Sequence, residues 1–489
     1  MVTTSSKKGN QLNRDQERLV NTLVAELEEN NLAVFAGAGL SSGAGYVNWK
    51  ELLRPIAADL DLDVEVETDL VTLAQYHANA NQANRAKLNQ LLVTEFSQKA
   101  VLTENHKLLA RMPISTYWTT NYDTLIETAV QDAGKTPDVK YTKKQLAYTK
   151  PKRDVVIYKM HGDVAHPGDA VLTRDDYEKY HVNMQPYITA LSGDLVSKTF
   201  LFLGFSFTDP NLEYILSRVR VYYGQDQRQH HCILKQVSRE EKETEANFEY
   251  RQRKQALFVQ ELLRVGIKTT FVTEYLEITA ILQAVECRFK QRTIFISGAA
   301  HEYGAWPADQ AQKFVHDLSI DIAKMSYRVV SGFGLGVGSA VITGVLEHTY
   351  MKGGRLDNDQ LLLRPFPQSQ PGGLPMKDLW TNYRKDMIQR AGIVILLFGN
   401  KLVDGKIEPS GGMREEFEIA KDFGAFLLPV GATGYIAEEL WREVIATFDE
   451  KKYAKGAEIR QKLALIGDAS APLADIRKYV VDIIALLKN

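Results

Sequence analysis

The feature that most constrains the fold is a run of small residues, FAGAGLSSGAG, at residues 35–45. It directly continues the short apolar run Leu32-Ala33-Val34-Phe35, which is typical of a buried strand. Glycines between a strand and a helix allow backbone N–H groups to approach a phosphate. The run therefore predicts an open α/β sheet with a phosphate site after an early strand. Gly43 falls one residue late for the usual dinucleotide fingerprint, so this interpretation needs support from other motifs.

Length and composition restrict the class of protein. A chain of 489 residues exceeds one ordinary hydrophobic core and predicts two domains. The net charge of −2 gives no electrostatic argument for nucleic acid or an anionic membrane as partner. We find no apolar run that approaches the roughly 18 residues of a membrane span, and no apolar signal region at the N-terminus. The two cysteines, Cys232 and Cys287, cannot form a four-cysteine zinc site. We expect a cytoplasmic protein without a metal.

Apolar strand-like runs alternate with helical patterns in two successive systems. The first contains the runs 32–37, 114–123, 155–162, 199–206 and 230–237, and the second contains 293–300, 327–334, 360–366, 392–399 and 425–431. This alternation predicts a doubly wound, Rossmann-like parallel sheet in each half. A long polar-faced helix is expected over 238–266, and a segment at 271–291 closes the first half. The predicted division is a polar tail 1–13, a first domain 14–288 and a second domain 289–489.

Two further features have a structural and a functional interpretation. The basic run 140–154 contains two tyrosines and could be a nucleic-acid patch, although such a run is more often a solvated loop. His230 and His231 could bind a metal, but no second ligand pair stands at useful spacing. We favour a solvated loop for the first and a polar strand start for the second.

Polar motifs follow several of the first-half strands. They are Thr119-Thr120-Asn121-Tyr122-Asp123, Lys159-Met160-His161-Gly162-Asp163 and Gly204-Phe205-Ser206-Phe207-Thr208-Asp209-Pro210-Asn211. An asparagine can orient a ribose hydroxyl or a water, and a histidine can accept a proton near neutral pH. Taken singly, Asn121 is more often a turn residue and His161 a core histidine. In this order after the glycine run, the functional interpretation is stronger.

These motifs, in this order over about half of the chain, resemble those of the sirtuin (SIR2) family of NAD-consuming enzymes. The resemblance implies catalytic roles for Asn121, His161 and Asp123, with NAD+ as substrate. It also implies NAD+ contacts from residues of the two glycine-containing loops: Ala36, Gly37, Ala38, Gly39, Ser41, Gly204 and Ser206. Sirtuin deacylases generally carry a four-cysteine zinc module, which two cysteines cannot build. Hydrolysis of NAD+ to ADP-ribose and nicotinamide is therefore favoured; protein deacylation, ADP-ribosylation and a non-catalytic nucleotide-binding scaffold remain alternatives.

The second half has its own glycine-rich loops. Residues 331–338 read SGFGLGVG after a strand-like run, and residues 409–418 read PSGGMREEFE. These stretches resemble the SLOG superfamily, which is related to the Lonely Guy phosphoribohydrolases. Where those enzymes carry Gly-Thr, this chain has Arg414-Glu415, and bulky charged side chains replace small phosphate-cradling ones. A nucleotide-sensing domain is therefore favoured over a second hydrolase.

Taken together, the two halves resemble the effectors of the Thoeris antiphage defence system. The resemblance implies that a TIR-domain partner protein makes a cyclic ADP-ribose isomer, which binds the SLOG domain and switches on NAD+ cleavage. It also implies homo-oligomers, either tetramers or larger assemblies. The implied signal-binding residues are Ser297, Gly298, Phe333, Gly334, Gly336, Arg384, Lys401, Gly411, Gly412 and Glu416. Arg384 and Lys401 suit a pyrophosphate, and Glu416 can accept hydrogen bonds from ribose hydroxyls.

Overall fold

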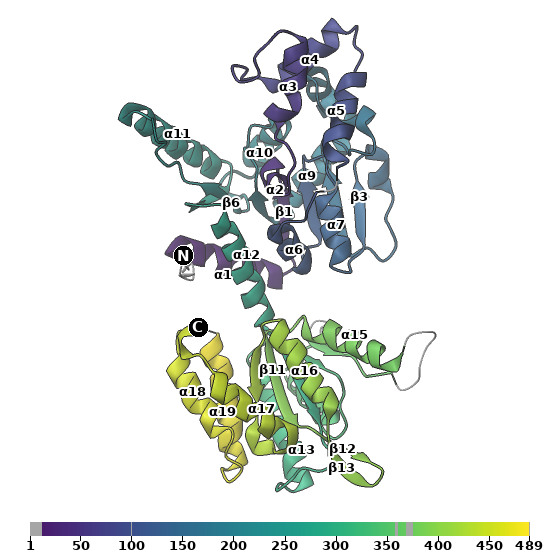
Figure 1. Ribbon diagram of the computed structural model, residues 1–489, viewed down its shortest axis with the longest axis vertical. Helices are drawn as coiled ribbons and strands as arrows, with labels where there is room; N and C mark the ends of the chain where they lie inside the picture. Colours follow the sequence, from purple (N-terminus) through teal and green to yellow (C-terminus); the bar gives the residue numbers. More distant parts are fainter. Residues whose placement is uncertain (1–11, 99, 357–359, 368–374, 489) are drawn as a thin grey trace, which may run out of the picture. The chain divides into compact units, whose positions relative to one another are not determined.

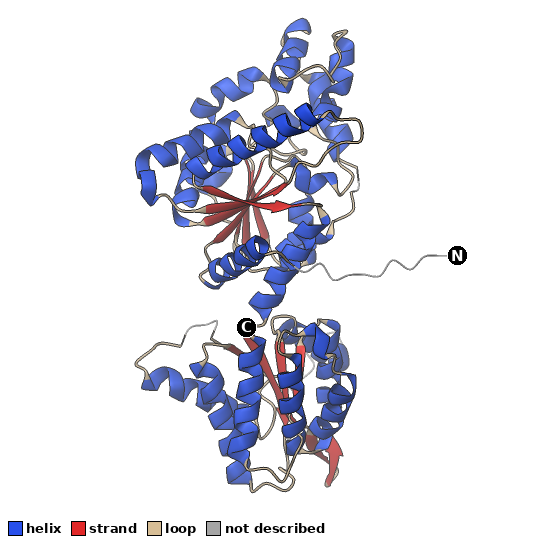
Figure 2. Ribbon diagram, turned by 90° about the vertical axis from the view of Figure 1, so that its left-hand side faces the viewer, coloured by secondary structure: helices blue, strands red, loops and turns tan. Residues whose placement is uncertain are grey.

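The computed structural model describes residues 12–98, 100–356, 360–367 and 375–488, which group into two compact units. The N-terminal unit comprises Met1–Glu286 and the C-terminal unit Cys287–Asn489. In each unit helices cover both faces of a parallel main sheet (Figures 1 and 2). The predicted fold class, two doubly wound α/β domains, is confirmed. Of the predicted tail, residues 1–11 lie outside the described residues, and Asn13 caps the first helix through its side-chain oxygen.

The main sheet of the N-terminal unit has seven parallel strands in the order β3-β4-β2-β1-β5-β6-β7. Their bounds are β1 Leu32–Ala36, β2 Thr116–Thr119, β3 Pro137–Lys140, β4 Val155–Lys159, β5 Thr199–Leu203, β6 His230–Lys235 and β7 Ile267–Val272. The helices are α1 Arg14–Glu28, α2 Ala38–Ser42, α3 Trp49–Asp59, α4 Leu70–Ala80, α5 Ala86–Phe96, α6 Glu104–Arg111, α7 Leu125–Asp132, α8 Arg174–Asn183, α9 Gln185–Ser197, α10 Pro210–Tyr223, α11 Glu245–Arg264 and α12 Leu276–Lys290.

The main sheet of the C-terminal unit has five parallel strands in the order β10-β9-β8-β11-β14. They are β8 Thr293–Ala299, β9 Arg328–Ser331, β10 Leu361–Leu363, β11 Ile393–Phe398 and β14 Phe426–Pro429; an antiparallel hairpin comprises β12 Asn400–Val403 and β13 Lys406–Pro409. The helices are α13 Ala308–Lys324, α14 Gly338–Met351, α15 Met376–Ile388, α16 Gly411–Asp422, α17 Tyr435–Thr447, α18 Gly456–Leu465 and α19 Leu473–Leu487.

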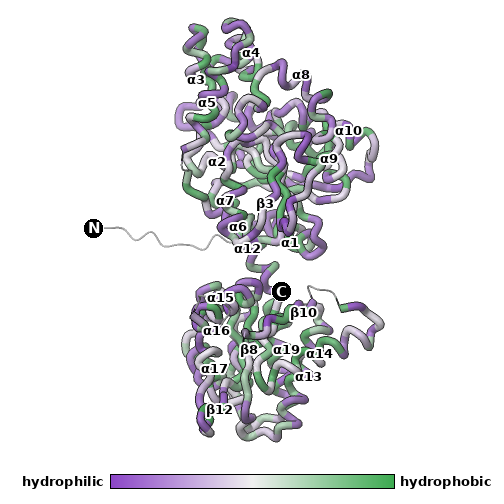
Figure 3. Tube along the Cα trace, turned by 90° about the vertical axis from the view of Figure 1, so that its right-hand side faces the viewer, coloured by the Kyte–Doolittle hydropathy of each residue, from purple (hydrophilic) through white to green (hydrophobic). Residues whose placement is uncertain are grey.

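The central strands are buried on both faces, so their sequences are continuous apolar runs. Every residue of β1, β5 and β11 is buried. Phe35 of β1 stacks on Phe202 of β5 with ring centroids 5.3 Å apart. Figure 3 shows hydrophobic stretches in the interior of each unit, with β8 in the green part of the trace. Among the described residues, no helix is long and apolar enough to cross a bilayer.

Four elements differ from the sequence-based prediction. The short strand β3, the strand β7 and the hairpin β12–β13 were not predicted. The helix expected over 238–266 is shorter, because Thr244 caps the start of α11 and the helix ends at Arg264. These are edge or exposed elements with few buried apolar residues, so their hydrophobic pattern is weak.

The basic run 140–154 was expected to be a solvated loop, but its first residue, Lys140, belongs to strand β3. Lys140 is buried at the end of β3, and its ammonium lies 2.8 Å from the carboxylate of Asp138. His230 and His231 are also buried, and the Phe200 N–H donates to His230 Nδ1 over 3.2 Å. Burial lowers the pKa of His230 to about 3 and that of His231 to about 4. The histidine pair is therefore part of the strand core, as the structural interpretation predicts.

Candidate functional site

The predicted motifs of the first half meet at the carboxyl edge of the N-terminal sheet. Strands β4, β2, β1 and β5 are neighbours and parallel, so the loops that follow them lie at one edge. Open α/β sheets bind ligands at this edge. The loops carry the glycine run, Asn121 with Asp123, His161, and the segment that starts at Gly204.

The glycines first serve to pack two of these loops together. A Cβ on Gly37 would lie 2.5 Å from the Gly204 carbonyl oxygen, and one on Gly204 would lie 2.2 Å from the Leu40 nitrogen. Gly204 also has φ +62°, and the Gly39 N–H donates to its carbonyl over 2.8 Å. The loop after β1 therefore rests directly on the loop after β5, and larger side chains would separate them.

A buried hydrogen-bond network joins the loops after β1 and β2. The Asn121 amide donates to the Gly37 carbonyl over 3.0 Å and to Ser41 Oγ over 2.9 Å. Ser41 Oγ in turn donates to Asp123 Oδ2 over 2.7 Å. At the base of the loops, Thr119 Oγ donates to the Ala36 carbonyl over 2.9 Å. The network fixes each side chain through its neighbours, as a preorganised site requires.

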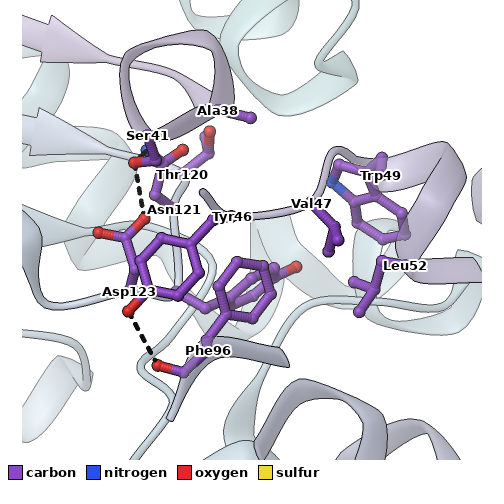
Figure 4. A pocket seen from close by; sticks show the side chains of 11 residues that line it. Ala38, Ser41, Tyr46, Val47, Trp49, Leu52, Phe96, Thr120, Asn121 and Asp123 are labelled. Atoms are coloured by element: carbon purple, nitrogen blue, oxygen red, sulfur yellow. Dashed lines mark hydrogen bonds between the residues drawn. The ribbon is translucent and has the colours of Figure 1, made fainter. Parts of the chain in front are cut away.

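This network forms one wall of a pocket with about 430 Å³ of empty space, part of it open solvent (Figure 4). The polar side chains of Ser41, Asn121 and Asp123 lie on the left of the close-up, whereas Val47, Trp49 and Leu52 lie on the right. The complete lining is Ala38, Ser41, Tyr46, Val47, Trp49, Leu52, Phe96, Thr120, Asn121, Tyr122 and Asp123. Its polar and aromatic sides suit a ligand that joins a planar ring to a hydroxyl-bearing group. Of the aromatic lining, Tyr122 belongs to a predicted motif, whereas Tyr46, Trp49 and Phe96 come from α3, α5 and the loop before α3, which the sequence motifs did not indicate.

A buried lysine supports the Asn121 loop from beneath. Lys159 Nζ donates to the Asp123 carbonyl over 2.6 Å and to the Tyr122 carbonyl over 3.1 Å. It also pairs with Glu127, 3.0 Å away, and with Asp163. Burial alone would lower the pKa of Lys159, but the two carboxylates outweigh it and raise the pKa. In the sequence, Lys159 stands inside an apolar strand-like run. A lysine buried in such a run requires partners for its charge, and this pattern could have indicated its role.

His161 follows β4 and is buried at the same edge. Its Nε2 lies 3.0 Å from Asp209 Oδ2, although this contact lacks the alignment of a hydrogen bond. Tyr177 of α8 meets the imidazole edge-on with ring centroids 5.4 Å apart. His161 does not line the pocket; nor do Gly204 and Ser206, whose hydroxyl lies 2.8 Å from Thr208 Oγ. The sequence predicted His161 but gave no role to Asp209.

In the C-terminal unit, glycine loops again pack at the carboxyl edge of the sheet. A Cβ on Gly334 would lie 1.9 Å from the Gly298 carbonyl oxygen, and one on Gly336 would lie 2.1 Å from that of Ala300. Gly336 has φ +73°. The loop after β9 therefore sits against the end of β8, where side chains from two helices also converge. Phe333 in this loop is about half exposed.

Those converging side chains form a buried ionic cluster. Ser297 Oγ donates to Glu416 Oε2 over 2.5 Å, and Arg384 Nε lies 3.5 Å from Glu416 Oε1. Arg384 also donates to Glu415 Oε2 over 2.8 Å and lies over the Phe366 ring. Burial raises the pKa of Glu416, although Ser297 and Arg384 oppose it.

Of the remaining predicted residues, Gly412 lies against this cluster. A Cβ on Gly412 would lie 2.6 Å from Arg384 Nη2, and Gly411 is the first residue of α16. Lys401 is exposed on the hairpin strand β12. Arg414, which replaces a small phosphate-cradling residue of the Lonely Guy loop, pairs on the surface with Glu443 at 3.0 Å.

Comparisons with known proteins agree with both halves. Residues 115–257 match a SIR2-like domain, and residues 277–487 match the Sir2- and TIR-associating SLOG family. The NAD(+) hydrolase ThsA of Bacillus cereus (strain MSX-D12) is 52% identical, covering 97% of this chain and 98% of that protein. The ThsA proteins of Cytobacillus dafuensis and Acinetobacter baumannii (strain 532279) are 47% and 43% identical, covering 97% of this chain and 97% and 99% of their own lengths. The chain therefore belongs to the family of ThsA NAD(+) hydrolases.

Proposed function

We propose that the N-terminal unit hydrolyses NAD+ to ADP-ribose and nicotinamide. The observation that carries the proposal is the Ser41–Asn121–Asp123 network on the wall of the pocket. The names of relatives more than 40% identical over nearly their whole length support the same activity. NAD+ is then the substrate, and the reaction needs no metal.

The chemistry suits these side chains. The bond from the ribose anomeric carbon to nicotinamide breaks, and its electron pair leaves with nicotinamide. The resulting oxocarbenium-like carbon is attacked by water, whose proton passes to His161. Asn121 orients a ribose hydroxyl or the water, and Asp123 fixes Ser41 beside it. The loops that hold Ala36, Gly37, Ala38, Gly39, Gly204 and Ser206 position the remainder of NAD+. Positioning and electrostatics supply most of the rate, because neutral nicotinamide needs no strong acid to leave.

We propose that the C-terminal unit binds the activating cyclic ADP-ribose isomer and that activation depletes NAD+ during antiphage defence. Arg384 and Lys401 would meet the pyrophosphate and Glu416 a ribose hydroxyl, while the loops of Gly298, Phe333, Gly334, Gly336, Gly411 and Gly412 shape the site with Ser297. The description of the family matched by residues 277–487, Sir2- and TIR-associating, supports a TIR-domain protein as the source of the signal. The cytoplasmic location and the domain border near 288 stay predictions.

Nicotinamide release from NAD+ tests the activity directly. We expect release that appears only with one isomer from a panel of cyclic ADP-ribose isomers, because a constantly active hydrolase would drain the cell. His161→Ala serves as the blank, with an expected loss of at least about 100-fold from removal of a general base. Release that requires an added protein or acyl-lysine peptide would instead indicate transfer or deacylation. Binding in both units without any product would indicate a scaffold.

We propose that α11 contributes to the homo-oligomer, a tetramer or larger assembly. Of its 20 residues only Leu262 is buried, and the helix extends away from the rest of its unit (Figure 1). Tyr250 and Leu257 lie seven positions apart, on one face, and both are exposed. Two exposed apolar side chains on one side of a helix that extends from its unit are suited to a contact with another subunit.

Leu257→Glu is therefore expected to reduce the mass of the particle in size-exclusion chromatography with light scattering. A buried charge at an apolar interface costs several kcal/mol, enough to dissociate subunits at micromolar concentration. Val66→Glu, at a similarly exposed position outside this helix, is the matched control and should leave the mass unchanged. An unchanged mass for Leu257→Glu would contradict the role of α11.

A further inference from the structure

Asp209 and His161 form a buried pair that spans the carboxyl edge of the N-terminal sheet. His161 follows β4 and Asp209 follows β5, and the strands β2 and β1 lie between them in the sheet. Both side chains are more than nine-tenths buried, and Nε2 lies 3.0 Å from Oδ2. A carboxylate this close to an imidazole constrains the orientation of the ring.

The two oxygens of Asp209 have different partners. Oδ1 accepts from the Leu212 N–H over 2.8 Å and so caps α10, which begins at Pro210. Oδ2 faces His161 Nε2, and the Tyr177 hydroxyl and the Asn211 N–H also reach the carboxylate. Burial would raise the pKa of Asp209, but the neighbouring imidazole of His161 and the hydrogen bonds from backbone N–H groups outweigh it, and the pKa lies below its usual range. The carboxylate is thus held in place by a helix terminus, not by a flexible loop.

The other ring nitrogen of His161, Nδ1, lies on the side of the imidazole away from Asp209. Nδ1 is buried and has no hydrogen-bond partner among the described residues. The rings of Tyr177 and Tyr180 approach His161 edge-on, with centroids 5.4 and 6.4 Å away. Tyr180 donates its hydroxyl to the Met160 carbonyl over 3.2 Å. An unpaired nitrogen in such surroundings carries a cost unless a substrate group completes it.

We propose that Asp209 is a positioning residue for the reaction, one that orients His161 and stabilises the imidazolium formed when the ring takes a proton. This inference rests on the proposed hydrolysis of NAD+. The proton leaves the attacking water, or the ribose hydroxyl that activates it, and is taken up by Nδ1. The carboxylate at Nε2 balances the new positive charge and is not itself protonated. His161 acts as the base, and Asp209 orients it, as the carboxylate does in other acid–histidine pairs.

The same contact has an opposite interpretation, in which Asp209 locks His161 away from substrate until the activator binds. The two interpretations predict opposite effects when the charge of Asp209 is removed. Loss of a positioning group slows the chemical step, whereas loss of a lock releases activity without activator. Activity measurements on one variant therefore separate them.

Asp209→Asn is the informative variant, because asparagine also caps helices well and keeps an oxygen for the Leu212 N–H. With saturating activator, we expect kcat for nicotinamide release to fall about 10- to 1,000-fold, with KM for NAD+ and the melting temperature unchanged. Asp69→Asn is the matched control, since Asp69 caps α4 by accepting from the Thr72 N–H over 2.9 Å on the surface. Its kcat should equal that of the unmodified protein.

Each alternative result has a distinct meaning. Unchanged kcat in Asp209→Asn, with His161→Ala inactive, would overturn the positioning role and leave the proposed hydrolysis intact. Activity of Asp209→Asn without activator would also overturn the positioning role, because it would mean that Asp209 holds His161 away from substrate until the activator binds. A parallel fall in melting temperature and a rise in KM would also overturn it, because they indicate a structural role. Nicotinamide release that survives His161→Ala would refute both the pair and the proposed active site.

Discussion

Asn121→Ala is expected to lower the rate of nicotinamide release from NAD+ at least about 1,000-fold. The amide occupies the centre of the network, where it donates both to the Gly37 carbonyl and to Ser41 Oγ. Its removal leaves Ser41 and Asp123 without their fixed neighbour and leaves the ribose or water without an orienting group. Losses of positioning and of a polar contact in the transition state multiply, which accounts for the size of the effect. The assay is initial-rate release with saturating activator.

Three further variants test whether this effect belongs to the network. Asn121→Asp has nearly the same shape, but it places an acceptor against the Gly37 carbonyl and should be equally inactive. Ser41→Ala should lower the rate, because Ser41 Oγ links Asn121 to Asp123. Ser42→Ala is its matched control: Ser42 is exposed and donates to the Gly39 carbonyl, so the rate should change less than about threefold. Full activity of Asn121→Ala, with a folded protein, would mean that NAD+ is cleaved elsewhere.

The folds of the two units could be predicted because burial on both faces leaves a clear pattern. The strands β1, β5 and β11 are continuous apolar runs, and each was predicted from the sequence. The edge strand β3 could not be recognised, because its sequence PDVK combines a proline, two charges and one apolar residue. The hairpin β12–β13 is similarly polar and exposed.

The part of the candidate site that lies at the strand ends could be predicted from the order of the motifs along the chain. Glycine loops and polar motifs at strand ends had to meet at one edge once the sheets were parallel, and Asn121 does contact Ser41. The partners of Lys159 and Asp209 were not predictable, because they depend on which loops face each other in three dimensions. For the same reason the sequence did not reveal the pocket wall formed by Tyr46, Trp49 and Phe96.

The structure also shows a packing role for the glycines that the sequence did not reveal. Each unit uses them where two loops come within contact distance: Gly37 against Gly204 in one, and Gly334 against Gly298 in the other. The glycine runs are therefore needed for the folded edge of each sheet, whether or not a phosphate is bound. A glycine-rich loop alone is consequently weaker evidence for a ligand than the polar network beside it.

Arg384→Ala is expected to raise the concentration of cyclic ADP-ribose isomer needed for half-maximal activation at least about 100-fold, or about 2.7 kcal/mol in binding free energy. Arg384 is the buried cation of the cluster with Glu415 and Glu416, and a charge-assisted contact to a pyrophosphate would depend on it. Arg384→Lys should recover only part of the affinity, because an ammonium lacks the paired donors of the guanidinium. Isothermal titration with the isomer, alongside nicotinamide release, measures both effects.

Stability must be separated from binding in this experiment, because Arg384 balances a buried carboxylate. Burial already raises the pKa of Glu416. This carboxyl group can therefore take up a proton when Arg384 is removed, which limits the loss of folding stability. Thermal melts without ligand measure that cost. Arg414→Ala is the matched control, since Arg414 of α16 pairs with Glu439 and Glu443 on the surface. If Arg384→Ala is folded and is activated at the same isomer concentration as Arg414→Ala, the signal does not bind at this cluster, and the exposed Lys401 hairpin becomes the next place to test.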